Sequence, residues 1–283
     1  MKRPETAITL IHEIIGNAPF LYEGNFTDGI VYAKELGYDC VEIHVTSVEE
    51  LKDPDLYDTL QTCQIRVSAL GTGRLYVNAG LSLTSQDPEN RLEAIRQLKE
   101  FIDCAKKLDC LVILGCVRGN IPALADRPKI LKLLGDSLKE LDQYAQERSV
   151  YMVFEPINRY ENNYLCNTYE ITDFIRQNEL SNTRMMIDTF HMNIEERDIQ
   201  QSIIDNLPYI KYAHFADSNR LYPGQGHMDF PMVLETLLSN GYNGIISAEC
   251  LPLPTKEAAA RGWIMSMKEL LEQYVKRNKT CWD

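Results

Sequence analysis

The sequence has no long apolar run and no excess of basic residues. No run of about 18 apolar residues occurs, so we expect no membrane-spanning helix. Lys and Arg number 29 against 41 Asp and Glu, which gives a formal net charge of −12. Nucleic acids and anionic membranes need a basic surface, so we expect neither as a partner. The N-terminus from Met1 to Thr6 lacks the apolar segment of a secretory signal, and we expect a cytoplasmic protein.

Signs of a disulfide framework and of a second domain are also missing. The eight cysteines include no Cys-x-x-Cys pair, and some, such as Cys40 and Cys116, lie in apolar runs, so we expect buried reduced thiols. No Gly/Ser linker, low-complexity segment or break in composition divides the chain. With 283 residues, 45% hydrophobic and 25% charged, the chain can bury a sizeable core. We therefore expect a single domain over residues 1–283.

The chain does contain a regular alternation of short β-rich runs and longer amphipathic runs. Expected strands cover residues 7–11, 40–45, 64–70 and 111–115, and four more runs end at or near residues 155, 188, 214 and 249. The runs are continuously apolar, as in parallel strands that are buried on both faces. Eight strands and eight helices in strict alternation predict a (β/α)8 TIM barrel. A doubly wound open sheet is the competing fold, but eight units of even length favour closure.

Several helix boundaries and one loop follow from local signals. Thr27 can cap a helix that Gly37 ends, and Asp87-Pro88-Glu89 has the order of a helix N-terminus. Residues 71–86 are expected to form a long loop over the barrel mouth. Later helices are expected at 130–147, 168–178, 196–206, 230–239 and 255–276. The helix after Asp87 is expected to bury one stripe made of Leu92, Ile95, Leu98, Ile102 and Ala105.

Four of the expected strands end on residues that can bind a metal ion. These residues are Glu155, Asp188, His214 and Glu249, which lie 33, 26 and 35 residues apart along the chain. A strand–helix unit of such a barrel takes about 30 residues, and its chemistry lies at the carboxyl ends of the strands. A single Glu, Asp or His after a strand is usually a helix cap or a structural group. Four at this spacing predict a shared site instead.

The chemistry of this set suits a hard divalent cation. Three carboxylates and one imidazole fit Mn²⁺, Mg²⁺ or Co²⁺ better than structural Zn²⁺, which favours thiolates. Other polar residues follow the same strand ends, and Pro223-Gly224-Gln225-Gly226 forms a rigid turn next to Arg220. Such a turn is suited to holding Arg220 over a pocket, although an ordinary surface loop is the simpler reading of that stretch alone.

The spacing of these motifs resembles that of the ketose 3-epimerases, the D-tagatose and D-psicose 3-epimerase branch of the xylose isomerase-like TIM barrels. The resemblance is carried by residues 151–250, through Glu155 with Asn158-Arg159-x-Glu161, Asp188-Thr189-Phe190-His191, His214-Phe215 with Asn219-Arg220-x-x-Pro223-Gly224-x-Gly226, and Glu249. It is weak over the first hundred residues. Pro156, Ala216-Asp217 and the stretch 71–86 depart from the pattern, so the identity of the sugar is left open.

The resemblance implies both a reaction and the residues that perform it. Glu155, Asp188, His214 and Glu249 would bind one divalent metal ion, with Mn²⁺ expected first. Glu155 and Glu249 would also be the acid/base pair that inverts C3 of a ketose through a cis-enediolate, a kind of help worth about 10²–10⁴-fold. Glu161, His191 and Arg220 would bind the sugar oxygens. Relatives of this kind are often homodimers or homotetramers, and the expected partner is a small sugar.

Three enzymatic alternatives share the same scaffold. An aldose–ketose isomerase acting on a sugar, a sugar phosphate or a hydroxypyruvate-type substrate would use the same metal site, and a phosphate would need a further cation, for which Arg74, Arg118 and Arg159 are candidates. An inosose-type dehydratase is a second alternative. An endonuclease IV-like repair enzyme is the third, but five histidines and a charge of −12 argue against it.

A sugar-binding barrel without catalytic activity is a further possibility, which the presence of all four candidate ligands argues against. The pocket that would choose the substrate is expected to be lined in part by residues 12–26 and 71–86. The candidate lining residues in these stretches are His12, Glu13, Phe20, Tyr22 and Tyr76.

Overall fold

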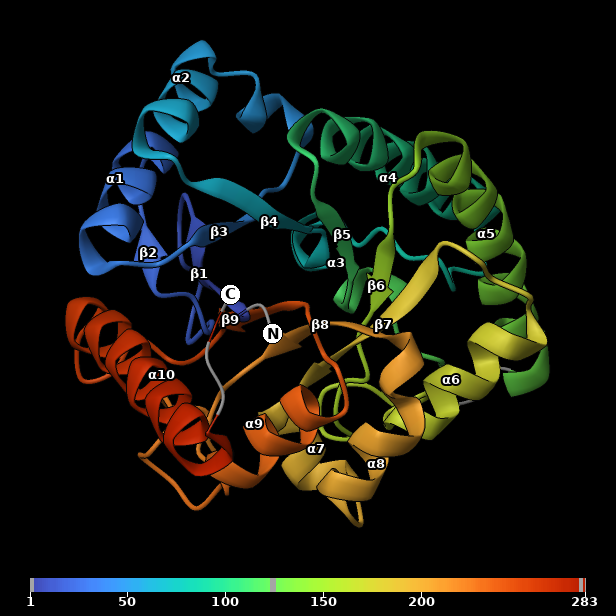
Figure 1. Ribbon diagram of the computed structural model, residues 1–283. Coiled ribbons are helices and arrows are strands. Elements are labelled where there is room, and N and C mark those ends of the chain that lie inside the picture. The colour runs from blue at the N-terminus through green and yellow to red at the C-terminus, as the bar shows by residue number, and fades with distance from the viewer. Residues whose placement is uncertain (1–2, 123–125, 280–281, 283) are drawn as a thin grey trace.

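The computed structural model describes residues 3–122, 126–279 and 282, and in it eight parallel strands close into a barrel (Figure 1). Neighbouring strands pair in chain order, and pairing of β1 with β9 closes the ring. A two-residue strand, β2 (Tyr22–Glu23), adds to β1 outside the ring. The predicted (β/α)8 TIM barrel is confirmed. The barrel strands are β1 (Glu5–Ile11), β3 (Cys40–His44), β4 (Arg66–Gly71), β5 (Leu111–Leu114), β6 (Met152–Phe154), β7 (Thr183–Asp188), β8 (Ile210–His214) and β9 (Ile245–Ala248).

A layer of eight buried residues fills the inside of the barrel. Each barrel strand contributes one of them, and most are small or aliphatic, so the barrel is a packed core and not a pore. Side chains alternate between the two faces of a strand, so residues two positions further along each strand point inward again, nearer its carboxyl end. The layer is Ala7, Cys40, Ala69, Ile113, Val153, Met186, Tyr212 and Ile245.

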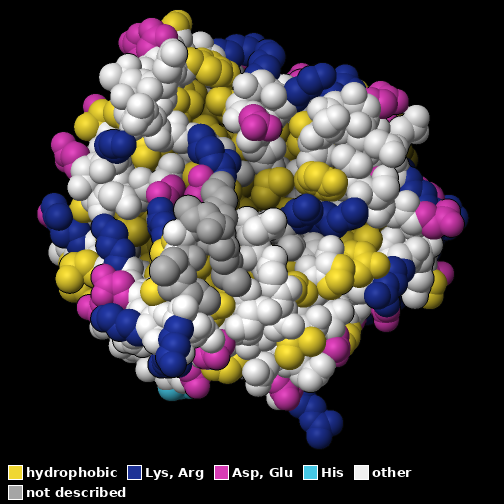
Figure 2. All heavy atoms as spheres, in the orientation of Figure 1, with side chains coloured by type: hydrophobic (Ala, Val, Ile, Leu, Met, Phe, Trp, Pro, Cys, Tyr) yellow, Lys and Arg dark blue, Asp and Glu magenta, His cyan; other side chains and the backbone are white. Residues whose placement is uncertain are grey.

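A second, larger apolar core lies between the strands and the outer helices, which surround the barrel in Figure 1. Among the described residues, no helix is both long and apolar enough to cross a bilayer. Figure 2 shows one end of the molecule, where Lys and Arg side chains are interspersed with Asp and Glu. The outer helices are α1 (Phe26–Leu36), α2 (Pro54–Cys63), α4 (Pro88–Leu108), α5 (Arg127–Arg148), α6 (Thr168–Gln177), α8 (Ile199–Asn206), α9 (Phe230–Ser239) and α10 (Lys256–Asn278).

Local signals set most helix boundaries. Asp87 caps α4 by accepting a hydrogen bond from the Glu89 amide, as predicted, and Gly37 ends α1 in the left-handed conformation with φ of 84°. The predicted cap of α1 was wrong by two residues, because Asn25 and not Thr27 is the cap. The Asn25 side chain accepts from the backbone and the hydroxyl of Thr27.

Two further predictions about helices need correction. Residues 71–86 are not one long loop, because they contain α3 (Gly73–Ala79), which ends at Gly80 and is anchored by buried Leu75. A second short helix at the barrel mouth, α7 (Thr189–Glu195), begins directly after β7. The alternation of strands and helices is therefore not strict. On α4, four of the five predicted apolar positions are buried, but Leu92 is exposed.

Candidate active site

Most polar residues of the site lie at the inward-facing level that follows the interior layer toward the carboxyl ends of the strands. Two residues beyond the layer, β7, β8 and β3 present Asp188, His214 and Glu42, and Glu155 occupies the corresponding position directly after β6. Neighbouring β5 has a glycine there. A Cβ on Gly115 would lie 2.7 Å from Glu155 Oε2, so the missing side chain gives this carboxylate its room.

The four predicted ligands form one buried group. One ligand atom from each of Glu155, Asp188, His214 and Glu249 lies within 4.8 Å of all the others. His214 Nδ1 is 3.3 Å from Glu249 Oε2, 3.9 Å from Glu155 Oε1 and 4.0 Å from Asp188 Oδ2. Ligands about 2.1 Å from one central cation lie about 3 to 4 Å apart. The arrangement is consistent with a divalent metal site.

Two atoms of this group have no hydrogen-bonding partner, which supports the same interpretation. Asp188 Oδ2 and His214 Nδ1 are both buried, and neither makes a hydrogen bond of ordinary geometry to any residue that the structure describes. Leaving buried polar atoms unsatisfied costs about 1–3 kcal/mol each. The other oxygen of Asp188 caps α7 by accepting from the Phe190 amide at 2.8 Å, so this residue is a helix cap and still offers one free ligand atom. The donor set therefore fits a hard cation.

A residue that the sequence did not single out holds His214 in place. Glu42 on β3 accepts from His214 Nε2 with both oxygens, at 2.9 and 3.2 Å. It also accepts from His44 Nε2 at 2.6 Å and from the Tyr212 hydroxyl at 2.9 Å. This carboxylate holds one proton on His214 Nε2, which directs Nδ1 toward the cluster, as in many metal-binding histidines. Burial opposes a charged ring, but the charges of Glu42 and Glu249 outweigh it and raise the pKa of His214 well above its usual range, so a metal ion at Nδ1 would replace a second proton.

Burial and charge shift the pKa values of the two glutamates in opposite directions. Burial, followed by the negative charge of Glu249, raises the pKa of Glu155 to about 8. Burial acts on Glu249 in the same sense, but positive His214 and Arg220 outweigh it and lower the pKa of Glu249 to about 2. Burial also raises the pKa of Asp188 to about 6. Without a metal ion, these shifts favour a proton on Glu155 over one on Glu249.

His191 lies beside the cluster as a neutral donor. Its Nδ1 accepts from Asn158 Nδ2 at 2.7 Å, which places its proton on Nε2. Nε2 lies 3.8 Å from Glu155 Oε1 and 3.7 Å from Asp188 Oδ2. Burial and the charge of Arg220 hold the pKa of His191 well below its usual range. Asn158 also donates to Glu161 at 2.8 Å, so it links both side chains.

Arg220 reaches the cluster from a tightly tied loop. The Asp217 carboxylate accepts from the amides of Gly224 at 2.8 Å and Met228 at 3.1 Å, which fixes the turn that the sequence predicted. Arg220 itself has a φ of +61°, and its guanidinium lies 4.7 Å from the centre of the Phe190 ring. It donates to Glu249 at 3.1 Å and to Glu161 at 3.5 Å.

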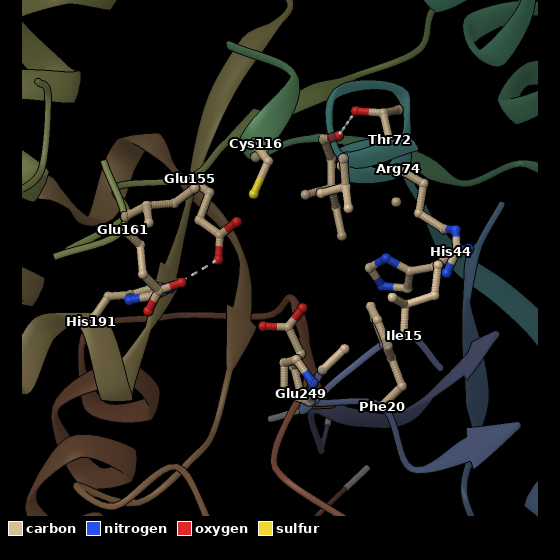
Figure 3. Close-up of a pocket in the computed structure, with 18 of the residues that line it drawn as sticks. Ile15, Phe20, His44, Thr72, Arg74, Cys116, Glu155, Glu161, His191 and Glu249 are labelled. Carbon is tan, nitrogen blue, oxygen red and sulfur yellow. Dashed lines mark hydrogen bonds and ion pairs between the residues drawn. The ribbon is translucent and has the colours of Figure 1, made fainter. Parts of the chain in front are cut away.

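A cavity of about 200 Å³ opens beside this cluster. Figure 3 shows Glu155, Glu161 and His191 on one side and His44, Arg74, Ile15 and Phe20 on the other. Among the described residues, five predicted site residues line the cavity, whereas Asp188 and His214 lie behind its surface. The five that line it are Glu155, Glu161, His191, Arg220 and Glu249.

Sequence reasoning missed or misplaced several parts of the lining. Of the five lining candidates from the N-terminal half, only Phe20 belongs to it. Cys40 is buried inside the barrel as expected, but Cys116 faces the cavity and is exposed, so its prediction as a core residue was wrong. His44 was not predicted. A Cβ on Gly71 would lie 2.1 Å from His44 Nδ1, so the glycine makes room for this ring.

Comparison with known proteins agrees with this geometry. Residues 30–267 match the family described as xylose isomerase-like TIM barrel. The chain is 32% identical over 240 residues to D-psicose 3-epimerase of Ruminiclostridium cellulolyticum, a match that covers 81% of this chain and 79% of that protein. It is 26% identical to 3-dehydro-D-guloside 4-epimerase of Escherichia coli, over 80% of this chain and 87% of that protein.

A solved structure of an L-ribulose 3-epimerase has the same fold. It superposes with a TM-score of 0.84 at 20% identity and covers 98% of this chain and 97% of its own. This likeness concerns the fold alone, because the identity is low. The sequence matches and the family match together show that the chain belongs to the ketose epimerases of the xylose isomerase-like TIM barrels.

Proposed function

We propose that this protein is a divalent-metal-dependent isomerase that inverts C3 of a small ketose. The observation that carries the proposal is the pair Glu155 and Glu249, two buried carboxyls that line one cavity and belong to one group of four candidate metal ligands. Burial and neighbouring charges move their pKa values in opposite directions. Opposite shifts in one site are typical of a general acid and a general base. Inversion of a carbon needs such a pair, because a proton leaves one face and another arrives on the opposite face.

Four residues would hold the metal ion. Glu155, Asp188, His214 and Glu249 offer three oxygens and one nitrogen, for which Mn²⁺ is the expected ion and Mg²⁺ or Co²⁺ the alternatives. When bound there, the cation supplies a Lewis acid that offsets the negative charge developing on the substrate as the carbon loses its proton. A bound cation would replace the proton on His214 Nδ1, so Arg220, which donates to Glu249 at 3.1 Å, would be the positive side chain left beside that glutamate.

The two glutamates would exchange protons with C3 from opposite sides. In one direction ionised Glu249 takes the C3 proton, and the electron pair of the C–H bond moves toward the C2 oxygen. The C2 carbonyl then re-forms as this pair returns to C3 and binds the proton that Glu155 delivers to the other face. Glu249 ends protonated and Glu155 ionised, and exchange with solvent restores both. The reverse reaction uses the same groups with exchanged roles. General acid–base help of this kind is worth about 10²–10⁴-fold.

Three neighbouring residues would position the sugar. His191 carries its proton on Nε2, directed at the cluster, and can donate to an oxygen on which charge develops. Arg220 is stacked on Phe190 and tied at its backbone, so its donors are held over the cavity. Glu161 is held by Asn158 and can accept from a sugar hydroxyl.

The relatives support a reaction next to a carbonyl carbon. A ketose 3-epimerase and a 3-dehydro-sugar 4-epimerase both invert the carbon beside a carbonyl. That proton transfer is the step that the paired glutamates of this chain would perform. The expected substrate is therefore a small ketose. Assembly into a homodimer or homotetramer stays a prediction.

Hydrogen exchange at defined carbons tests the proposal. The metal-loaded protein is incubated in D₂O with D-fructose, D-tagatose or L-ribulose, and deuterium at each carbon is followed by NMR. We expect exchange at C3 together with formation of the C3 epimer. Exchange at C1 with formation of an aldose would replace the epimerase with an aldose–ketose isomerase. No exchange at any carbon of these sugars or of their phosphates would exclude both the epimerase and the isomerase function.

A further inference from the structure

We propose that the substrate carries an anionic group, a carboxylate or a phosphate ester, at the end remote from the reacting carbon, and that Arg74 binds it. The inference rests on the proposed function for the direction in which the sugar lies. Glu161, His191 and Arg220 would hold the C1–C3 end on one side of the cavity. The remaining carbons then extend toward the other side, where Figure 3 shows Arg74 beside His44 and Phe20.

Of the three arginines that the sequence offered for an anionic substrate, only Arg74 lines the cavity. Arg118 is fully buried between the rings of Phe154 and Tyr164, with centroids at 5.3 and 5.1 Å, and is sealed from the cavity. Arg159 is neutralised by Glu195, which accepts from its Nε at 2.9 Å and its Nη2 at 2.8 Å. The geometry therefore selects one of the three.

The side chain of Arg74 is held in place by neutral groups. Its Nε donates to Thr46 Oγ1 at 3.2 Å, and its Nη1 donates to the backbone oxygen of Glu13 at 2.9 Å. Within the described part of the chain, no ion pair includes Arg74, and its Nη2 makes no hydrogen bond. Two bonds to neutral oxygens orient the guanidinium without cancelling its charge.

An unpaired arginine at this place contrasts with the rest of the site. The cavity is also lined by Glu155, Glu161 and Glu249, and the other arginine that lines it, Arg220, is paired with two of them. The whole chain has 41 acidic residues against 29 basic ones, so acidic partners are plentiful elsewhere. An arginine stays protonated in a protein, and its planar donors match a carboxylate or a phosphate.

Asn78 adds to the same wall. It lies one helical turn after Arg74 on α3, lines the cavity, and donates from Nδ2 to the same Thr46 hydroxyl at 3.2 Å. Thr46 therefore orients both side chains. The apolar side chains of Ile15, Phe20 and Val77 also line the cavity. Ile15 and Val77 are exposed, so an anionic group bound by Arg74 would remain partly in contact with water.

Three sugars with an identical reacting end test this assignment. D-fructose, D-fructose 6-phosphate and D-fructuronate differ only at C6, which is neutral, a phosphate ester or a carboxylate. We expect the wild-type protein to turn over at least one charged sugar with a kcat/KM about 10- to 100-fold above that for D-fructose. A preference for one charged sugar over the other identifies the anionic group. Arg74→Gln should abolish the preference, and Arg74→Lys should keep part of it.

A matched control and a binding measurement distinguish failure of the Arg74 assignment from failure of the proposed function. Arg96→Gln removes the same charge from an exposed site on α4, where Arg96 pairs with Glu93, and should leave the preference unchanged. The inference would be overturned by equal kcat/KM values for all three sugars, or by the same preference for a charged sugar in Arg74→Gln and Arg96→Gln. The proposed function would still hold in either case if the protein exchanges hydrogen at C3. Calorimetric binding of a charged sugar that depends on Arg74, without exchange at any carbon, would remove the proposed function and keep the inference.

Discussion

Replacing Glu42 with glutamine removes the acceptor that fixes the orientation of His214. The carboxylate receives hydrogen bonds from His214, His44 and Tyr212, and both of its oxygens are in use. Glutamine keeps the shape but turns one of the two oxygens into an NH₂ group, which cannot accept. In either orientation of the amide, at least one buried donor then faces another donor.

The expected loss follows from that geometry. A buried unsatisfied donor costs about 1–3 kcal/mol, and losing the group that orients a metal-binding histidine typically lowers metal affinity 10- to 100-fold. We therefore expect the Kd of Glu42→Gln for Mn²⁺ to rise by that factor, about 1.4–2.8 kcal/mol. Isothermal titration calorimetry of the metal-free protein measures it directly, and circular dichroism reports whether the variant is folded.

A control separates the loss of orientation from the loss of a carboxylate. Glu140 is an exposed glutamate on α5 that pairs with Lys99, so Glu140→Gln changes the same charge far from the site. Its Mn²⁺ affinity should equal that of the wild type. A folded Glu42→Gln variant with wild-type affinity would refute the argument that Glu42 prepares His214 Nδ1 for the metal ion.

Three further predictions test other parts of the site. Chelation of the metal with EDTA should stop turnover and lower Tm, and Mn²⁺ at 100 times its Kd should restore about 2.7 kcal/mol of stability in urea unfolding. Burial raises the pKa of Glu155 from 4.5 to about 8, so the metal-free fold binds this proton more tightly than the unfolded chain does, and the contribution of Glu155 to stability should be lost as pH rises from about 5 to 8. Urea unfolding across this range checks it, and Glu155→Gln should flatten the fall. Gly115→Ala places a Cβ 2.7 Å from Glu155 Oε2, so Mn²⁺ affinity should drop in calorimetry while circular dichroism stays unchanged; unchanged affinity would show that the carboxylate has other room.

The barrel and the four candidate metal ligands were predictable because short apolar segments of the sequence indicate both the strands and the residues at their ends. Each of the four runs ends on a polar residue, and closure brings all strand ends to one face. Asp188 can be both a helix cap and a candidate metal ligand, since one of its oxygens caps α7 and the other lies in the cluster. The roles of these residues in binding and catalysis stay predictions.

The residues that support the four candidate ligands could not be predicted from the last residues of the apolar runs alone. Glu42 lies inside a strand. The role of an acidic residue in a buried strand can be inferred only when the register of the strand shows whether its side chain points into the barrel. Glu42 follows Cys40 by two residues and therefore shares the inward face, opposite His214. A rule that flags buried acids two positions beyond the interior layer would have found it.

The remaining misses lie in connections, where local sequence is a weak guide. Residues 71–86 lie between an expected strand and an expected helix and predict a loop, yet they contain α3, whose Leu75 is buried in the larger apolar core. Arg74 owes its place in the cavity to that short helix. Cys116 appeared to continue an apolar strand, but β5 ends at Leu114 and the chain turns there toward the cavity.

Exchange at C3 in the two glutamate variants tests the two-sided proton transfer most directly. Glu155→Gln and Glu249→Gln, each loaded with Mn²⁺ to the same measured occupancy, are incubated in D₂O with each C3 epimer of one ketose. We predict that neither variant interconverts the epimers at more than about one hundredth of the wild-type rate. We also predict that each retains C3 exchange with a different epimer, the one whose proton faces the remaining glutamate. Exchange of the same epimer by both variants, or full epimerisation by either, would contradict a mechanism with two opposed carboxylates.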